Sequence, residues 1–180
     1  GFVDGDDTIE NDMYEMLVNN AIKYDTDISH CGYKVIENNK ETLFYGTEKL
    51  IIQDRKKGLL DLFEGTLIEP SICNKIFKNN IVGDIRLDES IKINEDLYFN
   101  VLLFDKSKKS VFEDKSKYTY IKREGSATTS SLNNIRKITD PRKVYKMIEE
   151  VFKNDIDILP YAEKMDIGRN INIYNLLTLE

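Results

Sequence analysis

Segments with the apolar spacing of helices alternate along this chain with segments typical of strands. Apolar residues at helical spacing predict helices at residues 11–24 and 95–106 and beyond Pro141. Short runs rich in β-branched and aromatic residues predict strands, which are expected at residues 28–35, 42–45, 85–87, 111–112 and 118–121. Strands interspersed with helices throughout the chain predict an α/β fold that ends in a helical tail.

Turn and capping residues predict the remaining local structure. Thr47 is a typical N-cap residue and predicts a helix at residues 48–53. Gly58 predicts a break before a second helical stretch, which ends at Gly65. After Pro70, we expect a short strand followed by a helical turn.

Composition limits the classes of protein to which the chain can belong. Its 180 residues are 41% hydrophobic, which is enough for one domain with a core. The formal net charge of −6 disfavours a nucleic-acid-binding surface. Binding of an anionic ligand would therefore require local positive charge, such as that of a metal ion. Two cysteines, Cys31 and Cys73, are too few for a disulfide framework and fit buried free thiols in a reducing compartment.

The sequence also limits the location of the protein and the kind of site it can carry. No apolar run approaches the ~18 residues needed to span a bilayer, and the N-terminus lacks a secretion signal. We therefore expect a soluble segment without a membrane span, located in the cytoplasm, with the cytoplasmic face of the membrane left open as a location. The single histidine, His30, excludes sites built on several histidines and is itself expected to pack within a strand. Carboxylates must then carry any acid–base or metal chemistry.

The densest charge lies at the start of the sequence, where GFVDGDDT contains Asp4, Asp6 and Asp7. Three carboxylates so close together repel one another, and a bound cation or its phosphate ligand relieves that repulsion. Gly5 favours a tight turn there. A solvated acidic turn is the simpler interpretation and stays open. Because a metal-binding turn normally follows a strand of about five residues, and only Gly1, Phe2 and Val3 precede this one, we expect a fragment of a longer protein.

Two further features can complete a site with this turn. Glu95 and Asp96 open the second predicted helix, and Arg123 begins a polar loop that extends to Ser131. Mg²⁺ or Mn²⁺ binds through one or two carboxylates plus substrate phosphates. Asp96 is a candidate general base, and Arg123 is a candidate phosphate ligand. Each feature also has an explanation without function, since acids favour helix N-termini and arginine is a common surface cation.

Four segments follow one another in a fixed order: FVDGDDTIENDMYEMLVNNA, CNKIFKNNIV, NEDLYFNVLLF and YIKREGSATTS. Together they resemble the family 2 inverting glycosyltransferases of the GT-A fold. The resemblance runs from the first residues to about Ser131. Four motifs in the right order are more specific than any one of them.

The resemblance implies a fold and a reaction. The chain would be the C-terminal, acceptor-side part of a GT-A nucleotide-diphospho-sugar transferase fold, with a mixed sheet flanked by helices. The N-terminal half, which holds the nucleotide in that family, is absent from this sequence. Residues 1–135 would form the acceptor and metal side, and residues 136–180 a helical extension. The implied reaction transfers a sugar from a nucleoside diphosphate to an acceptor hydroxyl, with inversion and metal assistance.

The same resemblance assigns roles to residues. Asp96 would be the catalytic base, and Asp4 and Asp6 would hold Mg²⁺ or Mn²⁺. The residues that would contact or lie near the donor are Asp4, Asp6, Asp7, Glu95 and Arg123. The partners would be a nucleotide-sugar donor and a glycan, lipid-linked or protein acceptor. Many GT-A enzymes supply a late histidine to the metal, but none follows His30 in this chain, so the rest of the ligand set stays open.

Two alternatives also stay open. DGDDT resembles the opening of haloacid-dehalogenase-like phosphatases, in which Asp4 would be the nucleophile and Asp6 the general acid. Asp84 and Asp88 imitate the later metal-binding motif of those enzymes. However, no clear strand ending in Ser or Thr lies between the two motifs, and NEDLYF and REGSAT are left unexplained. The second alternative is a non-catalytic binding domain with a transferase-like shell.

Overall fold

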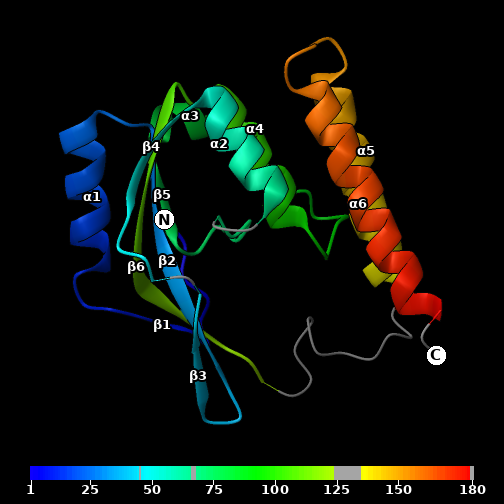
Figure 1. Ribbon diagram of the computed structural model, residues 1–180. Helices are drawn as coiled ribbons and strands as arrows, with labels where there is room; N and C mark the ends of the chain where they lie inside the picture. Colours follow the sequence, from blue (N-terminus) through cyan, green and yellow to red (C-terminus); the bar gives the residue numbers. More distant parts are fainter. Residues whose placement is uncertain (45, 66–67, 124–134, 179–180) are drawn as a thin grey trace.

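The computed structural model describes residues 1–44, 46–65, 68–123 and 135–178. In this part of the chain six strands form one mixed sheet, with helices on both of its faces (Figure 1). The strands are β1 (Thr8–Ile9), β2 (Ile28–Glu37), β3 (Lys40–Leu43), β4 (Leu50–Asp54), β5 (Lys75–Phe77) and β6 (Lys109–Ile121). The helices are α1 (Met13–Tyr24), α2 (Arg55–Glu64), α3 (Asn79–Val82), α4 (Glu95–Lys106), α5 (Arg136–Phe152) and α6 (Leu159–Thr178).

The two long strands, β2 and β6, form the centre of the sheet. They pair in parallel, from Ile28 opposite Ser110 to Ile36 opposite Ile121. On its other edge β6 pairs antiparallel with β4 and then with β1, while β2 pairs antiparallel with β5 and then with β3. The short β1 strand therefore holds the acidic N-terminal turn beside the end of β6.

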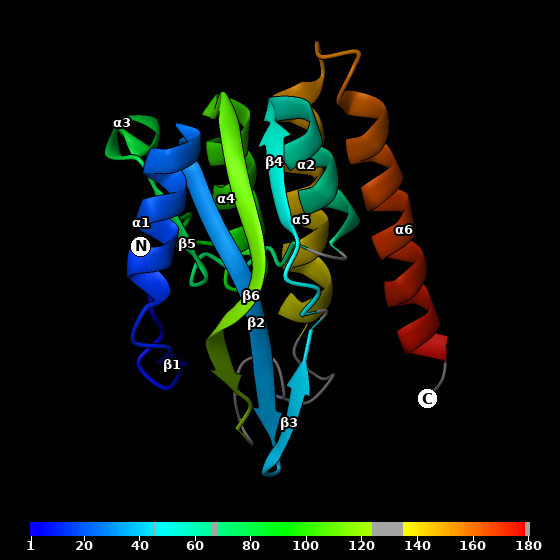
Figure 2. The same cartoon turned by 60° about the vertical axis from the view of Figure 1, so that its left-hand side comes forward.

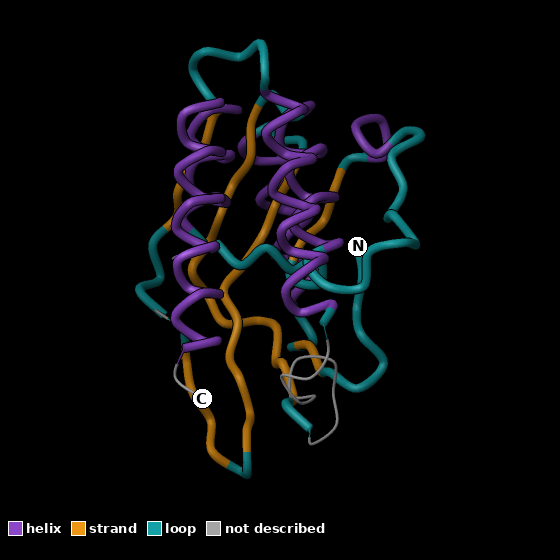
Figure 3. Tube along the Cα trace, turned by 90° about the vertical axis from the view of Figure 1, so that its right-hand side faces the viewer, coloured by secondary structure: helices purple, strands orange, loops and turns teal. Residues whose placement is uncertain are grey.

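The helices form layers on the sheet. Helix α1 packs on one face of β2 and β6, while α2 and α4 pack on the opposite face (Figures 1 and 2). Helices α5 and α6 pack against each other and add a further layer over α4 and α2 (Figure 3). The buried apolar side chains between these layers form a continuous core, which includes Met13 and Leu17 of α1 and Phe104 of α4. No helix in the described part of the chain has the length and apolar character needed to cross a membrane.

Most of the predicted elements are confirmed. Helices occupy Met13–Tyr24 and Glu95–Lys106, and β2 covers and extends the strand that we predicted at residues 28–35. Helix α2 ends at Gly65, whose φ of 57° lies in the left-handed region that glycine adopts easily. His30 packs in the core, where its ring lies 4.9 Å from that of Phe112.

Several local predictions are wrong. Residues 48–53 lie largely in strand β4 rather than in a helix, and Thr47 does not cap a helix but donates its hydroxyl to the Asp114 carboxylate at 2.6 Å. Gly58 lies within α2 instead of breaking it. The segment at residues 85–87 is not a strand.

Two predicted boundaries also differ from the structure. The two predicted strands at residues 111–112 and 118–121 are parts of the single strand β6. The last stretch of helix starts before Pro141, because α5 begins at Arg136 and includes the proline. The division of the chain at residue 135 stays a prediction.

Candidate functional site

The acidic turn is fixed to the end of β6 by Asp7. The backbone amide of Asp7 closes the turn on the Asp4 carbonyl at 3.2 Å. One oxygen of the Asp7 carboxylate accepts a hydrogen bond from the Tyr118 hydroxyl at 2.5 Å, and the other accepts one from the Ile121 amide at 2.9 Å. The Asp7 side chain therefore serves the local structure, and its predicted contact with the donor stays a prediction.

The carboxylates of Asp4 and Asp6 are left open by this arrangement. Both residues are exposed, and within the described residues neither carboxylate accepts a hydrogen bond or forms an ion pair. The described part of the chain contains no group of three or more His, Cys, Asp or Glu residues that would hold a metal ion. Two free carboxylates still fit Mg²⁺ or Mn²⁺, because these ions take their remaining oxygen ligands from phosphates and water.

Arg123 lies beside the same turn. Its guanidinium donates a hydrogen bond to the backbone carbonyl of Asp6 at 3.1 Å. The structure therefore brings this predicted phosphate ligand to the acidic cluster. The rest of the predicted polar loop, residues 124–131, lies outside the described residues.

Asp96 and Glu95 occupy the first turn of α4. Burial raises the pKa of Asp96 to about 6, and the nearby carboxylates of Glu95 and Asp4 add to this rise. The amide of Ile72, which lies 3.4 Å from a carboxylate oxygen of Asp96, and the ammonium of Lys75 act in the opposite direction. The ring of Phe2, two residues before Asp4, packs edge-on against the ring of Phe99 in α4, with 6.1 Å between the ring centroids, so the N-terminal segment lies against this helix.

Sequence reasoning missed several side chains of this site. Tyr118 bonds to the turn, and the thiol of Cys73 lies near Tyr118, Asp4 and Asp96. Lys75 is fully buried, and its ammonium donates hydrogen bonds to the carbonyl groups of Glu69 and Ser71. The one available signal was the lysine itself, because CNKIF places a charged residue within an apolar strand.

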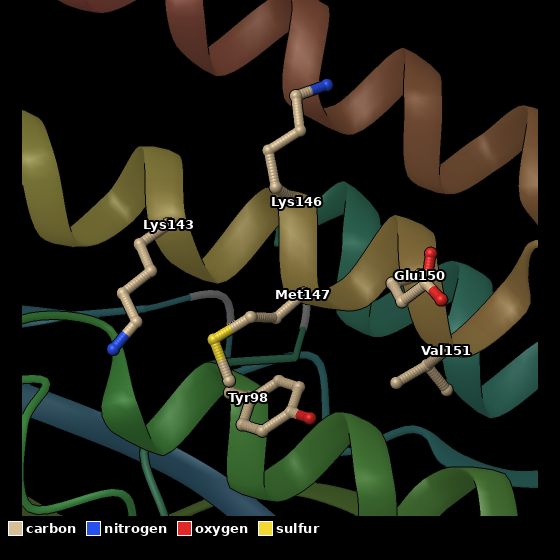
Figure 4. A pocket seen from close by; sticks show the side chains of 6 residues that line it. All are labelled: Tyr98, Lys143, Lys146, Met147, Glu150 and Val151. Atoms are coloured by element: carbon tan, nitrogen blue, oxygen red, sulfur yellow. The ribbon is translucent and has the colours of Figure 1, made fainter.

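Two cavities lie away from the acidic turn. One of about 420 Å³ is a groove between α4 and α5, lined by Tyr98, Met147 and Val151 and bordered by charged side chains (Figure 4). It contains none of the predicted site residues. A second cavity of about 380 Å³ lies among α2, α4, α5 and α6 and includes Glu69 and Asn94 in its lining.

No protein-family model matches this sequence. The chain is 31% identical over 136 residues to Glycosyltransferase GlyA of Streptococcus pneumoniae serotype 4 (strain ATCC BAA-334 / TIGR4); the match covers 69% of this chain and 19% of that protein. Among solved structures, S. aureus TarS 1–349 in complex with UDP-GlcNAc superimposes with a TM-score of 0.67 and 21% identity, over 92% of this chain and 45% of that one. TarS 1–349 in complex with UDP gives a TM-score of 0.62 at 18% identity, over 92% of this chain and 44% of that one.

These comparisons confirm the predicted fold class. The mixed sheet flanked by helices matches part of the TarS glycosyltransferase fold. The chain spans less than half of the TarS structures and about a fifth of GlyA.

Proposed function

We propose that this chain, whose sequence and fold match part of a glycosyltransferase, supplies the acceptor and metal side of an inverting, family 2 nucleotide-sugar transferase. The observation that carries the proposal is the meeting of the acidic turn with Asp96. The ring of Phe2 contacts that of Phe99 in α4, and Asp4 adds to the raised pKa of Asp96, although 92 positions separate the two aspartates in the sequence. Such convergence of open carboxylates with a perturbed, half-buried acid is typical of an active site.

Asp96 is the proposed base. It removes the proton from the acceptor hydroxyl while that oxygen attacks the anomeric carbon of the donor, from the side opposite to the nucleoside diphosphate. The carbon–oxygen bond to the leaving diphosphate breaks as the new glycosidic bond forms, so one displacement inverts the configuration. A pKa of about 6 suits this role, because the carboxylate is ionised at neutral pH and is a stronger base than an exposed aspartate.

The turn and Arg123 are the proposed binding groups for the diphosphate. Asp4 and Asp6 would hold Mg²⁺ or Mn²⁺, which offsets negative charge on the leaving group when bound. Arg123, which already contacts the turn, would donate to phosphate oxygens. Glu95 lies next to the base and is a candidate for contact with the sugar or the acceptor.

The structure does not favour the phosphatase alternative. That alternative needs Asp84 and Asp88 to join Asp4 around a metal ion. Asp88 instead accepts hydrogen bonds from the amide and hydroxyl of Ser90 and lies 3.7 Å from the ammonium of Lys143 in α5.

The test is transfer and donor binding by the full-length protein and its Asp96→Asn variant. The solved TarS complexes hold UDP-GlcNAc and UDP, so uridine nucleotide-sugars are the first donors to assay, with Mn²⁺ or Mg²⁺ present. We expect Asp96→Asn to lower kcat by about a thousandfold or more, while calorimetry shows donor affinity within about threefold of wild type.

A matched control is Asp88→Asn, which removes a carboxylate bonded only to Ser90 and Lys143 among the described residues. This variant should transfer sugar at the wild-type rate. Normal turnover by Asp96→Asn would remove Asp96 from the role of base, and donor binding that is indifferent to the metal would remove Asp4 and Asp6 from theirs.

A further inference from the structure

The segment at residues 69–74, which leads into β5, is held by the fully buried Lys75. The ammonium of Lys75 donates to the carbonyl oxygens of Glu69 and Ser71, each at 2.6 Å, and to the side-chain oxygen of Asn74 at 2.7 Å. All three N–H groups of the ammonium are thus used. Asn74 in turn donates to the carbonyl of Cys31 at 2.5 Å, which connects the lysine to strand β2.

The same loop is held from its other side by α4. The side-chain amide of Asn100 donates to the carbonyl of Pro70 and, at 3.0 Å, to the carbonyl of Asp96 one turn earlier in the helix. Three successive carbonyl groups, those of residues 69, 70 and 71, therefore point to Lys75 and Asn100. The next amide group, that of Ile72, lies 3.4 Å from the Asp96 carboxylate.

We propose that Lys75 and Asn100 are positioning residues: they hold the loop at residues 69–74 by its carbonyl groups, so that the Ile72 amide fixes the orientation of the Asp96 carboxylate. This inference rests on the proposed role of Asp96 as the base. A freely rotating carboxylate would spend less time aimed at the acceptor hydroxyl, and misplacement by about 1 Å can lower a rate by about a hundredfold.

The cost of burying a lysine supports a role beyond packing. A buried ammonium loses its hydration, which is why burial lowers the pKa of Lys75 to about 8. An apolar side chain would fill the same space without that penalty. Lys75 instead gives every hydrogen bond to the segment at residues 69–74, which borders the site.

The test compares Lys75→Met and Asn100→Leu with a control, Gln53→Met, in the full-length protein. Gln53 is also fully buried and bonds to His30, Ser110 and Asp61, and within the described residues its side chain forms no hydrogen bond to residues 69–74. Each variant is assayed for kcat, for donor KM and for hydrogen exchange of the Ile72 amide.

We expect Lys75→Met and Asn100→Leu to lower kcat by about tenfold or more, with donor KM within about twofold of wild type. The Ile72 amide should exchange faster in both. Gln53→Met should lose stability but keep kcat and Ile72 exchange near wild type. If Lys75→Met does not fold, Asn100→Leu provides the test. The side-chain oxygen of Asn100 has no hydrogen-bond partner among the described residues, so replacing this residue by leucine should cost less stability.

A folded Lys75→Met or Asn100→Leu protein with wild-type kcat and unchanged Ile72 exchange would overturn the inference. A fall in kcat of the same size in Gln53→Met would also overturn it, since the effect would then be general destabilisation. Absence of transfer by the wild-type protein with every donor would be a failure of the proposed function instead, and Ile72 exchange would still show whether Lys75 holds the loop.

Discussion

The ionised carboxylate of Asp96 lowers the stability of the folded chain at the candidate site. Its pKa in the folded chain is raised from 3.8 to about 6, so the charged form is disfavoured by folding. At 1.36 kcal/mol for each unit, the ionised carboxylate destabilises the fold by about 3 kcal/mol. This penalty is absent below about pH 4, where both states hold the proton, and complete above about pH 6.

Asp96→Asn should therefore stabilise the protein by about 1–3 kcal/mol at pH 7, because asparagine is neutral and can still accept from the Ile72 amide. Urea unfolding without metal or donor, at several values of pH, measures this difference. The gain should shrink as the pH falls from 7 to 4. An equal gain at both ends of that range would show that charge burial is not its cause.

The Tyr118 hydroxyl holds the acidic turn through two hydrogen bonds: it donates to the Asp7 carboxylate and accepts from the Asp4 backbone amide at 3.4 Å. Tyr118→Phe removes the donor to Asp7 and should cost about 1–2 kcal/mol of stability, since hydrogen bonds to charged groups are worth more than neutral ones. A looser turn places Asp4 and Asp6 less well, so Mn²⁺-dependent donor binding should weaken by about tenfold in a calorimetric titration.

Tyr145→Phe is the matched control for that substitution. The Tyr145 hydroxyl is also buried and accepts a hydrogen bond from the side chain of Asn94 at 3.0 Å, but it lies on α5 and not beside the turn. Its loss should lower stability without changing the metal dependence of donor binding. If both variants weaken Mn²⁺-dependent donor binding equally, the hydrogen bond from Tyr118 does not position the acidic turn for metal binding.

At the scale of elements, helix α2 shows why Gly58 does not break a helix here. A Cβ atom at this position would lie 2.8 Å from Cδ1 of Phe104 in α4 and 3.3 Å from the Ser110 hydroxyl in β6. Glycine thus lets α2 approach its neighbours closely, and this packing outweighs the roughly 1 kcal/mol that glycine costs inside a helix.

Gly58→Ala should consequently destabilise the protein by about 1–3 kcal/mol, through overpacking against Phe104. Gly168→Ala is the control, because a Cβ atom there meets no described atom within 4 Å and α6 should gain about 0.5–1 kcal/mol. Thermal unfolding of the two variants should shift in opposite directions. A stabilised Gly58→Ala would mean that α2 and α4 can move apart without loss.

At the scale of the whole molecule, the candidate site joins segments that are far apart in the sequence. The turn at residues 4–7, the loop at residues 69–74, the start of α4 and the end of β6 meet because β1 pairs with β6 and α4 packs across the sheet.

The sequence by itself determined the α/β class, the order of the four motifs and the residue types of the site. Helical periodicity located α1 and α4, because each buries one continuous apolar stripe. The helix predicted at residues 48–53 was wrong because it rested on Thr47 as an N-cap residue. Residues distant in the sequence determine the structure of that segment. Strand β6 pairs with it, and the Asp114 carboxylate accepts a hydrogen bond from the Thr47 hydroxyl.

Tertiary structure alone decided which carboxylates stay open. Asp4, Asp6 and Asp7 look alike in the sequence, yet only Asp7 is bonded to Tyr118 and Ile121. Likewise, the role of Lys75 depends on carbonyl groups that become neighbours only after the loop folds over it. Local spacing determines the periodicity of helices and strands, whereas hydrogen-bond partners and burial come from contacts between distant residues.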